Sequence, residues 1–257
     1  MSSKKPKIAI IGFGRFGKLL AEILASSCQI FIISQKKIKN KNFQQIDYPD
    51  LKNIDIIIPA VPISFLKNML KKISPFLKND SLVMDVCSVK VYPCKWLKKY
   101  LPENIEILGS HPMFGPDSAK KGLAGLQIIF CPLRISSERF KAVKNIFEKL
   151  DLKIIEMTPE KHDKQSAVSL ALVHFIGRGL EKIKINKQKI STLGFEKLLQ
   201  VCDNVTNDSW ELFYDMNNYN PYAKKVRKKF IKSLQKINLE IGLNNRKKNI
   251  NKKNKFK

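Results

Sequence analysis

The chain has 257 residues, which is long enough to bury a full hydrophobic core and to form two domains. Its hydrophobic content of 44% excludes wholesale disorder, and no apolar run approaches the roughly 20 residues that a membrane-spanning helix needs. The net charge of +26 is compatible with nucleic-acid binding. Two observations argue against that function: lysine far outnumbers arginine, and much of the excess positive charge lies in two polar runs, residues 36–41 and 246–257.

The first half of the chain is predicted to alternate strands and helices. An apolar run at residues 7–11 leads directly into a glycine-rich segment, and a helical pattern and a second apolar run, 30–33, follow. Strands rich in Ile, Leu and Val that alternate with helices form parallel sheets, so we predict an α/β fold with a Rossmann-type doubly wound sheet over residues 1–157. The further predicted strands are residues 54–60, 81–86, 106–109, 126–131 and 153–157.

The second half is predicted to be helical. Thr158 and Pro159 are typical of a helix start, because a capping hydroxyl is followed by proline at the first helical position. Helical patterns then dominate, with interruptions near Gly194 and at 217–222. We therefore expect an all-helical domain over residues 158–243 and a basic, disordered tail over residues 244–257.

The glycine-rich segment has the spacing of a dinucleotide-binding turn. Gly12 permits the tight turn, Gly14 lets the backbone approach a pyrophosphate, and Gly17 allows the helix to pack closely on the strand. The helix that begins near Arg15 points free N–H groups toward the phosphates. A glycine turn that binds nothing is the alternative. The predicted cofactor-binding residues are Gly12, Gly14, Arg15, Phe16, Gly17, Ser34, Lys36 and Val61.

The end of the second strand favours NADP over NAD. Sites for NAD usually have an acidic residue there, which holds the ribose 2′-hydroxyl. This chain has Ser34 followed by Gln35, Lys36 and Lys37, so no carboxylate repels a 2′-phosphate and a serine and a lysine are available to bind one. NAD stays possible, because the alternative for Lys36 and Lys37 is that they merely belong to a solvated run of lysines.

His111 is the candidate acid–base group. It lies between the strand predicted at 106–109 and a rigid turn of proline and glycine, and the chain has only three histidines. The ordinary pKa of imidazole, near 6.5, suits proton transfer at neutral pH. A histidine next to proline can also be a simple turn residue.

Several segments follow the glycine turn in an order that resembles the prephenate/arogenate dehydrogenase family of tyrosine biosynthesis, over roughly residues 7–223. The stretches 111–118 and 208–220 look most similar to those of the plant-type arogenate dehydrogenases. The resemblance implies a Rossmann domain followed by a helical domain that forms a homodimer. The segments that carry this resemblance are Asp85 to Lys90 (DVCSVK), Ser110 to Pro116 (SHPMFGP), His162-Asp163, Ser169 to Arg178 (SLALVHFIGR) and Asp208 to Tyr214 with Tyr219-Asn220.

The resemblance also implies a reaction. A cyclohexadienol ring loses hydride from the carbon that bears its hydroxyl, and aromatisation drives loss of the ring carboxylate as carbon dioxide. By resemblance His111 accepts the hydroxyl proton, and Ser88 orients the same hydroxyl or the nicotinamide. Ser88 also fits a second role, the N-cap of a helix predicted at residues 91–100.

The predicted substrate-binding residues are His174, Arg178 and Asp208. His174 and Arg178 lie one helical turn apart and share a face; His174 is a substrate contact by resemblance, or else a core histidine between the domains. Arg178 fits a carboxylate clamp and a structural ion pair equally well. The pair His162-Asp163 is interpreted as structural or as supporting the site.

Asp208 favours arogenate over prephenate. Prephenate-preferring bacterial members of the family usually carry a Thr-Arg pair at the matching place, whereas this chain has Val205-Thr206-Asn207-Asp208. A carboxylate repels the keto-acid side chain of prephenate and pairs with the ammonium of arogenate. The alternative for Asp208 is an acidic residue at a helix N-terminus.

We thus predict an NADP-dependent arogenate dehydrogenase, with a prephenate dehydrogenase as the first alternative and a non-catalytic basic nucleotide- or nucleic-acid-binding protein as the second. The partners expected are a small-molecule substrate and a second copy of the chain, without membrane or nucleic acid. Five cysteines without a CxxC pair indicate neither a disulfide framework nor a metal site and favour the cytoplasm.

Overall fold

The computed structural model describes residues 5–40 and 42–253, and it describes side chains as far as residue 243. The N-terminal part is an eight-stranded sheet in the order β3-β2-β1-β4-β5-β6-β7-β8. Neighbouring strands are parallel except for β6 and β7, which pair antiparallel. The strands are β1 (Lys7–Ile11), β2 (Gln29–Ile33), β3 (Gln44–Gln45), β4 (Ile56–Pro59), β5 (Leu82–Met84), β6 (Glu106–Pro112), β7 (Gln127–Arg134) and β8 (Lys153–Glu156).

Helices cover both faces of the sheet, as the doubly wound prediction requires. Side chains alternate along a strand, so Ile8 and Ile10 of β1 face one core and Ala9 and Ile11 face the other. The first core includes residues of α1 and α5, and the second includes residues of α2 and α3. The helices of this domain are α1 (Arg15–Leu24), η1 (Tyr48–Asn53), α2 (Ile63–Ile73), η2 (Ser74–Phe76), α3 (Val91–Tyr100), α4 (Pro116–Ala119) and α5 (Ser137–Glu148).

Strand β6 corrects one prediction from the sequence. The strand predicted at residues 106–109 continues to Pro112, so His111 lies inside β6 and not in the turn after it. The extension exists because β7 folds back beside β6 and pairs His111 with Ile129. A long-range pairing of this kind gives no signal in the local sequence, where Ser, His and Pro are poor strand formers.

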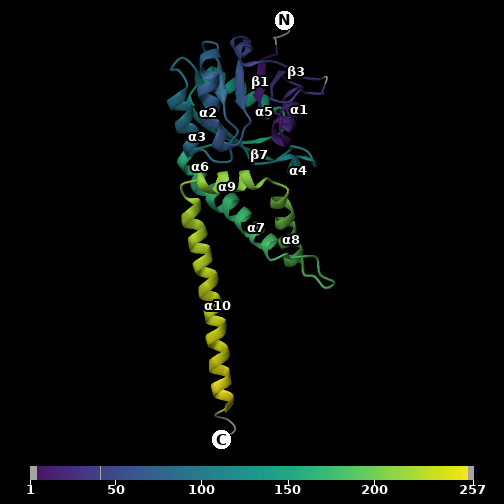
Figure 1. The fold of residues 1–257 in the computed structure, drawn as a ribbon, viewed down its shortest axis with the longest axis vertical. Coiled ribbons are helices and arrows are strands. Elements are labelled where there is room, and N and C mark those ends of the chain that lie inside the picture. The colour runs from purple at the N-terminus through teal and green to yellow at the C-terminus, as the bar shows by residue number, and fades with distance from the viewer. Residues whose placement is uncertain (1–4, 41, 254–257) are drawn as a thin grey trace.

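The C-terminal part is helical, and Figure 1 shows it below the sheet domain, with α9 next to that domain and α10 extending away from it. Helix α6 begins as predicted, because the hydroxyl of Thr158 accepts a hydrogen bond from the N–H of Lys161. The predicted domain boundary at residue 157 falls between β8 and α6. The helices are α6 (Pro159–Ser166), the short π-helix η3 (Ala167–Leu172), α7 (Val173–Lys182), α8 (Leu193–Thr206), α9 (Trp210–Asn218) and α10 (Ala223–Lys253).

Two boundaries predicted for the helical part differ from those in the structure. The first interruption spans residues 183–192, and Gly194 belongs to the first turn of α8. A disordered tail was predicted from residue 244, but α10 continues past that position to Lys253. Residues 254–257 of that predicted tail lie outside the described residues. None of the helices within the described ranges is both long enough and apolar enough to span a membrane.

Candidate functional site

The glycine turn at the carboxyl end of β1 has the geometry that a pyrophosphate needs. Gly12 has a φ of +106°, and a Cβ there would lie 2.4 Å from the carbonyl oxygen of Ala60. A Cβ on Gly17 would lie 2.1 Å from the carbonyl oxygen of Gly12, so α1 packs against the turn without room for a side chain. At Gly14, in contrast, a Cβ would meet nothing within 4 Å.

The start of α1 is therefore open to an anion. Gly14 is its N-cap and provides no side chain to satisfy the first N–H groups of the helix. These N–H groups and the positive end of the helix dipole attract a phosphate. The turn and its neighbours fit the nicotinamide dinucleotide expected from the sequence. Val61 lies beside this turn, 3.5 Å from the Cβ position of Gly12, while Phe16 packs against the core of the sheet.

Arg15 links the glycine turn to the helical domain. One guanidinium nitrogen donates to the carbonyl oxygen of Asn207, and another donates to Asp117 Oδ2, both at 2.7 Å. Asn207 is the residue directly before Asp208. The predicted cofactor residue and the predicted substrate selector therefore lie at one junction between the two domains.

The loop after β2, which contains Ser34 and Lys36, is held by Gln45 of β3. The Gln45 side chain donates to the carbonyl oxygen of Ser34 and accepts from the N–H of Ile38, each at 3.0 Å. The hydroxyl of Ser34 accepts from the N–H of Lys36 at 3.3 Å, and the Lys36 side chain is exposed. No local pattern pointed to Gln45, because a two-residue strand of glutamines has no apolar pattern.

His111 is buried and forms a chain of hydrogen bonds with two residues of α6. His111 Nδ1 lies 2.8 Å from His162 Nε2, and His162 Nδ1 lies 2.8 Å from Asp163 Oδ1. Asp163 also accepts the N–H groups of Lys90, at 2.6 Å, and of Val91, at 2.9 Å. The oxygens of Asp163 act as acceptors, and this fixes the donor-to-acceptor direction of the hydrogen-bond chain.

The direction decides which nitrogen of His111 is free to accept a proton. Since Asp163 accepts, His162 Nδ1 must donate, and the Nε2 of a neutral His162 is then an acceptor. His111 Nδ1 therefore donates to His162, which leaves His111 Nε2 without a proton. Sequence reasoning placed His162 and Asp163 in a supporting role; the adjacent His-Asp pair at the helix start was the signal, but nothing local showed its contact with His111.

Both rings of this pair are held in the neutral form. Burial lowers the pKa of His111 well below its usual 6.5, and the neighbouring His162 and Lys90 lower it further. Burial also lowers the pKa of His162, although the hydrogen bond to Asp163 opposes the change. At neutral pH the His111 ring is thus neutral, with Nε2 able to accept a proton as a base.

Ser88 follows the carboxyl end of β5, the parallel neighbour of β6. It does not cap α3, since Asp163 accepts the first N–H groups and Lys90 holds the N-cap position. The Ser88 hydroxyl is buried, and none of the described residues forms a hydrogen bond with it. A buried hydroxyl without a partner is rare, so it is available for a substrate or cofactor group.

The predicted substrate-binding residues form a second group. His174 Nε2 lies 3.9 Å from Asp208 Oδ2, and within the described part of the chain His174 Nδ1 is buried without a partner. Burial lowers the pKa of His174 to about 4, and the charge of Arg178 acts in the same direction. Burial raises the pKa of Asp208, which lies one residue before Ser209, the N-cap of α9. The cap at this helix start is therefore Ser209 and not Asp208.

Arg178 has structural partners, which supports the ion-pair alternative. Its guanidinium donates to Glu181 at 2.9 Å and to the carbonyl oxygen of Asp208, and it lies 4.3 Å from the ring centre of Trp210. Its Nε is buried and has no partner among the described residues. Arg178 thus holds the segment that carries Asp208.

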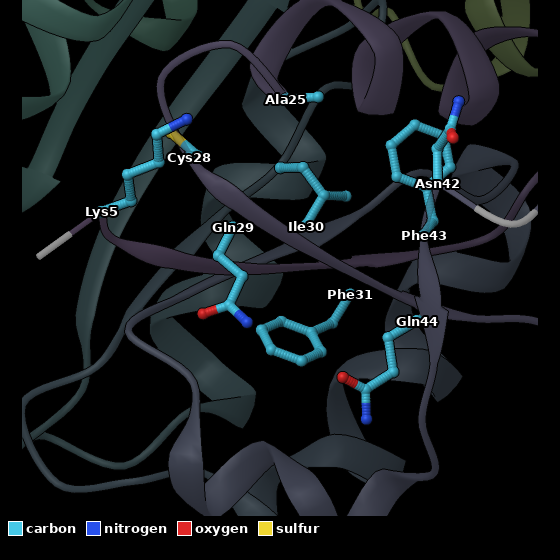
Figure 2. A pocket seen from close by; sticks show the side chains of 9 residues that line it. All are labelled: Lys5, Ala25, Cys28, Gln29, Ile30, Phe31, Asn42, Phe43 and Gln44. Carbon is cyan, nitrogen blue, oxygen red and sulfur yellow. The ribbon is translucent and has the colours of Figure 1, made fainter.

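A hollow of about 530 Å³ lies elsewhere, at the amino ends of the strands, and Figure 2 shows it beside Lys5, Gln29 and Gln44. Ligands of open α/β sheets bind at the carboxyl ends of the strands. The hollow is therefore at the opposite edge of the sheet from the glycine turn and His111, and we do not assign it to the site.

Comparison with known proteins agrees with this geometry. Residues 32–156 match the family model described as prephenate dehydrogenase, nucleotide-binding domain, and residues 179–254 match one described as TYRAAT1-like, C-terminal domain. The chain is 34% identical to arogenate dehydrogenase 2, chloroplastic, of Arabidopsis thaliana over 91% of this chain and 70% of that protein. It is 31% identical to arogenate dehydrogenase 1, chloroplastic, of the same plant, over 91% of this chain but only 39% of the longer relative.

A solved structure has the same fold. The crystal structure of prephenate dehydrogenase from A. aeolicus in complex with hydroxyphenyl propionate and NAD+ superposes with a TM-score of 0.75, at 21% identity, over 94% of this chain and 92% of that one. The fold therefore agrees with the matching sequences, and these establish that the chain belongs to the prephenate/arogenate dehydrogenase family, whose members are NAD(P)-dependent oxidoreductases.

Proposed function

We propose that the protein oxidises L-arogenate to L-tyrosine with NADP as the hydride acceptor and with release of carbon dioxide. The observation that carries the proposal is the directed hydrogen-bond chain from Asp163 through His162, because it leaves His111 Nε2 as a free acceptor. The base lies in the same sheet as the glycine turn, two strands from β4, which pairs directly with β1.

The chain's own residues then have distinct tasks. His111 Nε2 accepts the proton of the ring hydroxyl as hydride leaves the same carbon and the carbon–oxygen bond becomes a carbonyl. The bond to the ring carboxylate breaks, its electron pair completes the aromatic ring, and His111 returns the proton to the phenolic oxygen. The nicotinamide supplies the hydride acceptor. The unpartnered hydroxyl of Ser88 is suited to orient the ring hydroxyl.

Asp208 supports arogenate as the substrate. Its side chain is 32% exposed and lies next to His174, in a segment held by Arg15 and Arg178. A carboxylate at this place attracts the ammonium group of arogenate and repels the keto acid of prephenate. The relatives named above as arogenate dehydrogenases are consistent with this choice.

NADP is favoured by the loop after β2. The loop has no acidic side chain between Ser34 and Ile38, and the network of Gln45 holds its backbone in place. A 2′-phosphate would meet the Ser34 hydroxyl and the Lys36 ammonium there, without a repelling carboxylate.

We also propose that two copies of the chain pair through the helical domain. Helix α10 extends away from the rest of the chain (Figure 1). It has a series of exposed apolar side chains. Ile231, Leu234, Ile237 and Ile241 recur every three or four residues and so share one face of the helix, with exposed fractions between 41% and 58%. An exposed apolar face of this kind is typical of a protein interface. Leu239 and Leu243 are also exposed but lie on another side of the helix. The five cysteines are free and buried, which agrees with the reducing cytoplasm we expect.

The test is an activity matrix of two substrates and two cofactors on the purified protein. We expect the highest kcat/KM with arogenate and NADP. His111→Ala should abolish turnover and leave NADP binding unchanged, because His111 does not lie in the glycine turn. Activity on prephenate alone would contradict the substrate assignment, and tight binding of nucleic acid by an enzyme inactive on both substrates would favour the non-catalytic alternative.

A further inference from the structure

Lys90 is a fully buried lysine for which the proposed reaction has no use. Its side chain and that of Asp85 are both 0% exposed, and it is among the largest fully buried side chains of the described residues. Its ammonium pairs with the Asp85 carboxylate and donates to the carbonyl oxygen of Ser110. Burying a charge is costly even when it is paired, so a fully buried lysine at this place suggests a specific structural or functional role for Lys90.

The side chain of Lys90 contacts the residue next to His111, and its backbone contacts the residue that binds His162. The ammonium holds the carbonyl of Ser110, the residue directly before His111 in β6. The backbone N–H of Lys90 donates to Asp163 Oδ1, the same oxygen that accepts from His162. Lys90 thus fixes the backbone next to one ring and the carboxylate that orients the other.

Asp85 completes the arrangement. Its carboxylate accepts the N–H of Ser110 at 3.2 Å and that of Cys87 at 3.0 Å, while its carbonyl accepts the hydroxyl of Ser110. Ser110 is therefore held at its N–H, its carbonyl and its hydroxyl by Asp85 and Lys90. The position of β6 at His111 depends on this ion pair.

The charges that face His111 come from two segments. Lys90 comes from the segment between β5 and α3 and pairs with Asp85, and His162 comes from α6 and pairs with Asp163. On the other side, β7 pairs the apolar Ile129 with His111. Burial works to lower the pKa of Lys90, but Asp85 together with the neighbouring thiols raises it above its usual value. Lys90 consequently remains a cation at neutral pH.

We propose that Lys90 is a positioning residue, which sets the ring of His111 against His162 and keeps His111 in its neutral, proton-accepting form. Lys90 positions the ring through its hydrogen bond to the carbonyl oxygen of Ser110. It favours the neutral form because its fixed positive charge lies close to the His111 imidazole. The inference rests on the proposed function only in that His111 serves as its base.

The experiment compares the wild type with the double variant Lys90→Met/Asp85→Asn, which removes both buried charges and keeps similar side-chain volumes. Lys95→Met is the matched control, because it removes one exposed lysine from α3. The first readout is the pH titration and tautomer of each histidine by NMR of the imidazole nitrogens. With three histidines in the chain, single His→Gln variants are sufficient for the assignment. The second readout is the pH profile of kcat/KM.

We expect His111 in the wild type to remain neutral, with its proton on Nδ1, throughout the pH range in which the protein is folded. In the double variant a titration of His111 and an acid limb of kcat/KM should both appear within this pH range, and kcat should fall by up to about 100-fold because the ring is less well placed. NADP affinity should be unchanged, and Lys95→Met should behave as the wild type.

Three results separate the possibilities. A folded double variant that binds NADP and in which His111 titrates as in the wild type would overturn the proposal and leave Lys90 a purely structural residue. A wild-type His111 that titrates near pH 6.5 would also overturn it, whether or not the double variant folds. An enzyme inactive on both substrates would contradict the proposed function, while the NMR titration would still decide the role of Lys90.

Discussion

Asp215 of α9 caps helix α2 across the boundary between the two domains. Its Oδ2 accepts the N–H of Ser64 at 2.9 Å and the hydroxyl of Ser64 at 3.0 Å. The N-cap residue of α2 is Pro62, which has no side-chain acceptor, so the carboxylate from the helical domain takes this role. The helix that follows Val61 is thereby fastened to the domain that carries the predicted substrate residues.

We therefore expect Asp215→Ala to lower the free energy of unfolding by about 0.5–2 kcal/mol, the range for the loss of an N-cap acceptor. Urea denaturation measures the change. Asp203→Ala on α8 is the control, because that side chain is exposed and forms no ion pair among the described residues. Equal stability of the two variants would show that the cap contributes nothing.

Asp163→Asn should lower kcat by about 10²–10⁴-fold, as expected when a histidine is forced into the wrong tautomer. An amide at this position can donate to His162 Nδ1 and so reverse the direction of the hydrogen-bond chain to His111. Steady-state kinetics with saturating cofactor measures kcat. Glu160→Gln, an exposed change on the same helix, is the control and should keep full activity; a similar loss in both variants would speak against the directed chain.

His174 should make the stability of the protein depend on pH. Burial lowers its pKa from 6.5 to about 4 in the folded state, so below pH 6.5 the unfolded state binds more protons than the folded state. Its contribution is full above pH 6.5 and is lost as the pH falls from 6.5 toward 4. The slope from one such group is at most about 1.4 kcal/mol per pH unit. Urea denaturation at several pH values should show a shallower decline for His174→Gln than for the wild type, and parallel curves would refute the shift.

Ser34→Asp should reverse the cofactor preference. A carboxylate at the end of β2 repels a 2′-phosphate and accepts the 2′-hydroxyl of NAD, so the ratio of kcat/KM for NADP to that for NAD should fall at least about tenfold. Ser26→Asp, which adds the same charge at an exposed position after α1, is the control. An unchanged ratio in Ser34→Asp would move the 2′-phosphate site away from this loop.

Leu234→Glu combined with Ile237→Glu should convert a dimer to a monomer, because charges replace two exposed apolar side chains of α10. Size-exclusion chromatography with light scattering measures the mass. Lys232→Glu combined with Lys236→Glu adds as many acidic residues to the same helix and should leave the dimer intact. A wild type that is monomeric at working concentrations would rule the proposal out.

Local patterns predicted the sheet domain well because its strands are buried on both faces and bounded by turn residues. The run Lys7–Ile11 and the glycine turn gave β1 and the start of α1 directly. Strand β3 was missed because its two glutamines pair with β2 without any apolar signal. For the candidate site, the sequence singled out individual residues such as His111 but not the contacts between them. The contact of His111 with His162 joins residues 51 apart, and only the tertiary fold brings them together.

The π-helix η3 sets the rotational phase between two functional histidines. In an uninterrupted α-helix, a separation of twelve residues leaves His162 and His174 about 120° apart around the axis. One extra residue in a wide turn removes about 100° of that angle, so both side chains come to nearly the same line along the helix. The irregular turn therefore aligns His162, which contacts His111, with His174, which lies by Asp208, along one side of the helix.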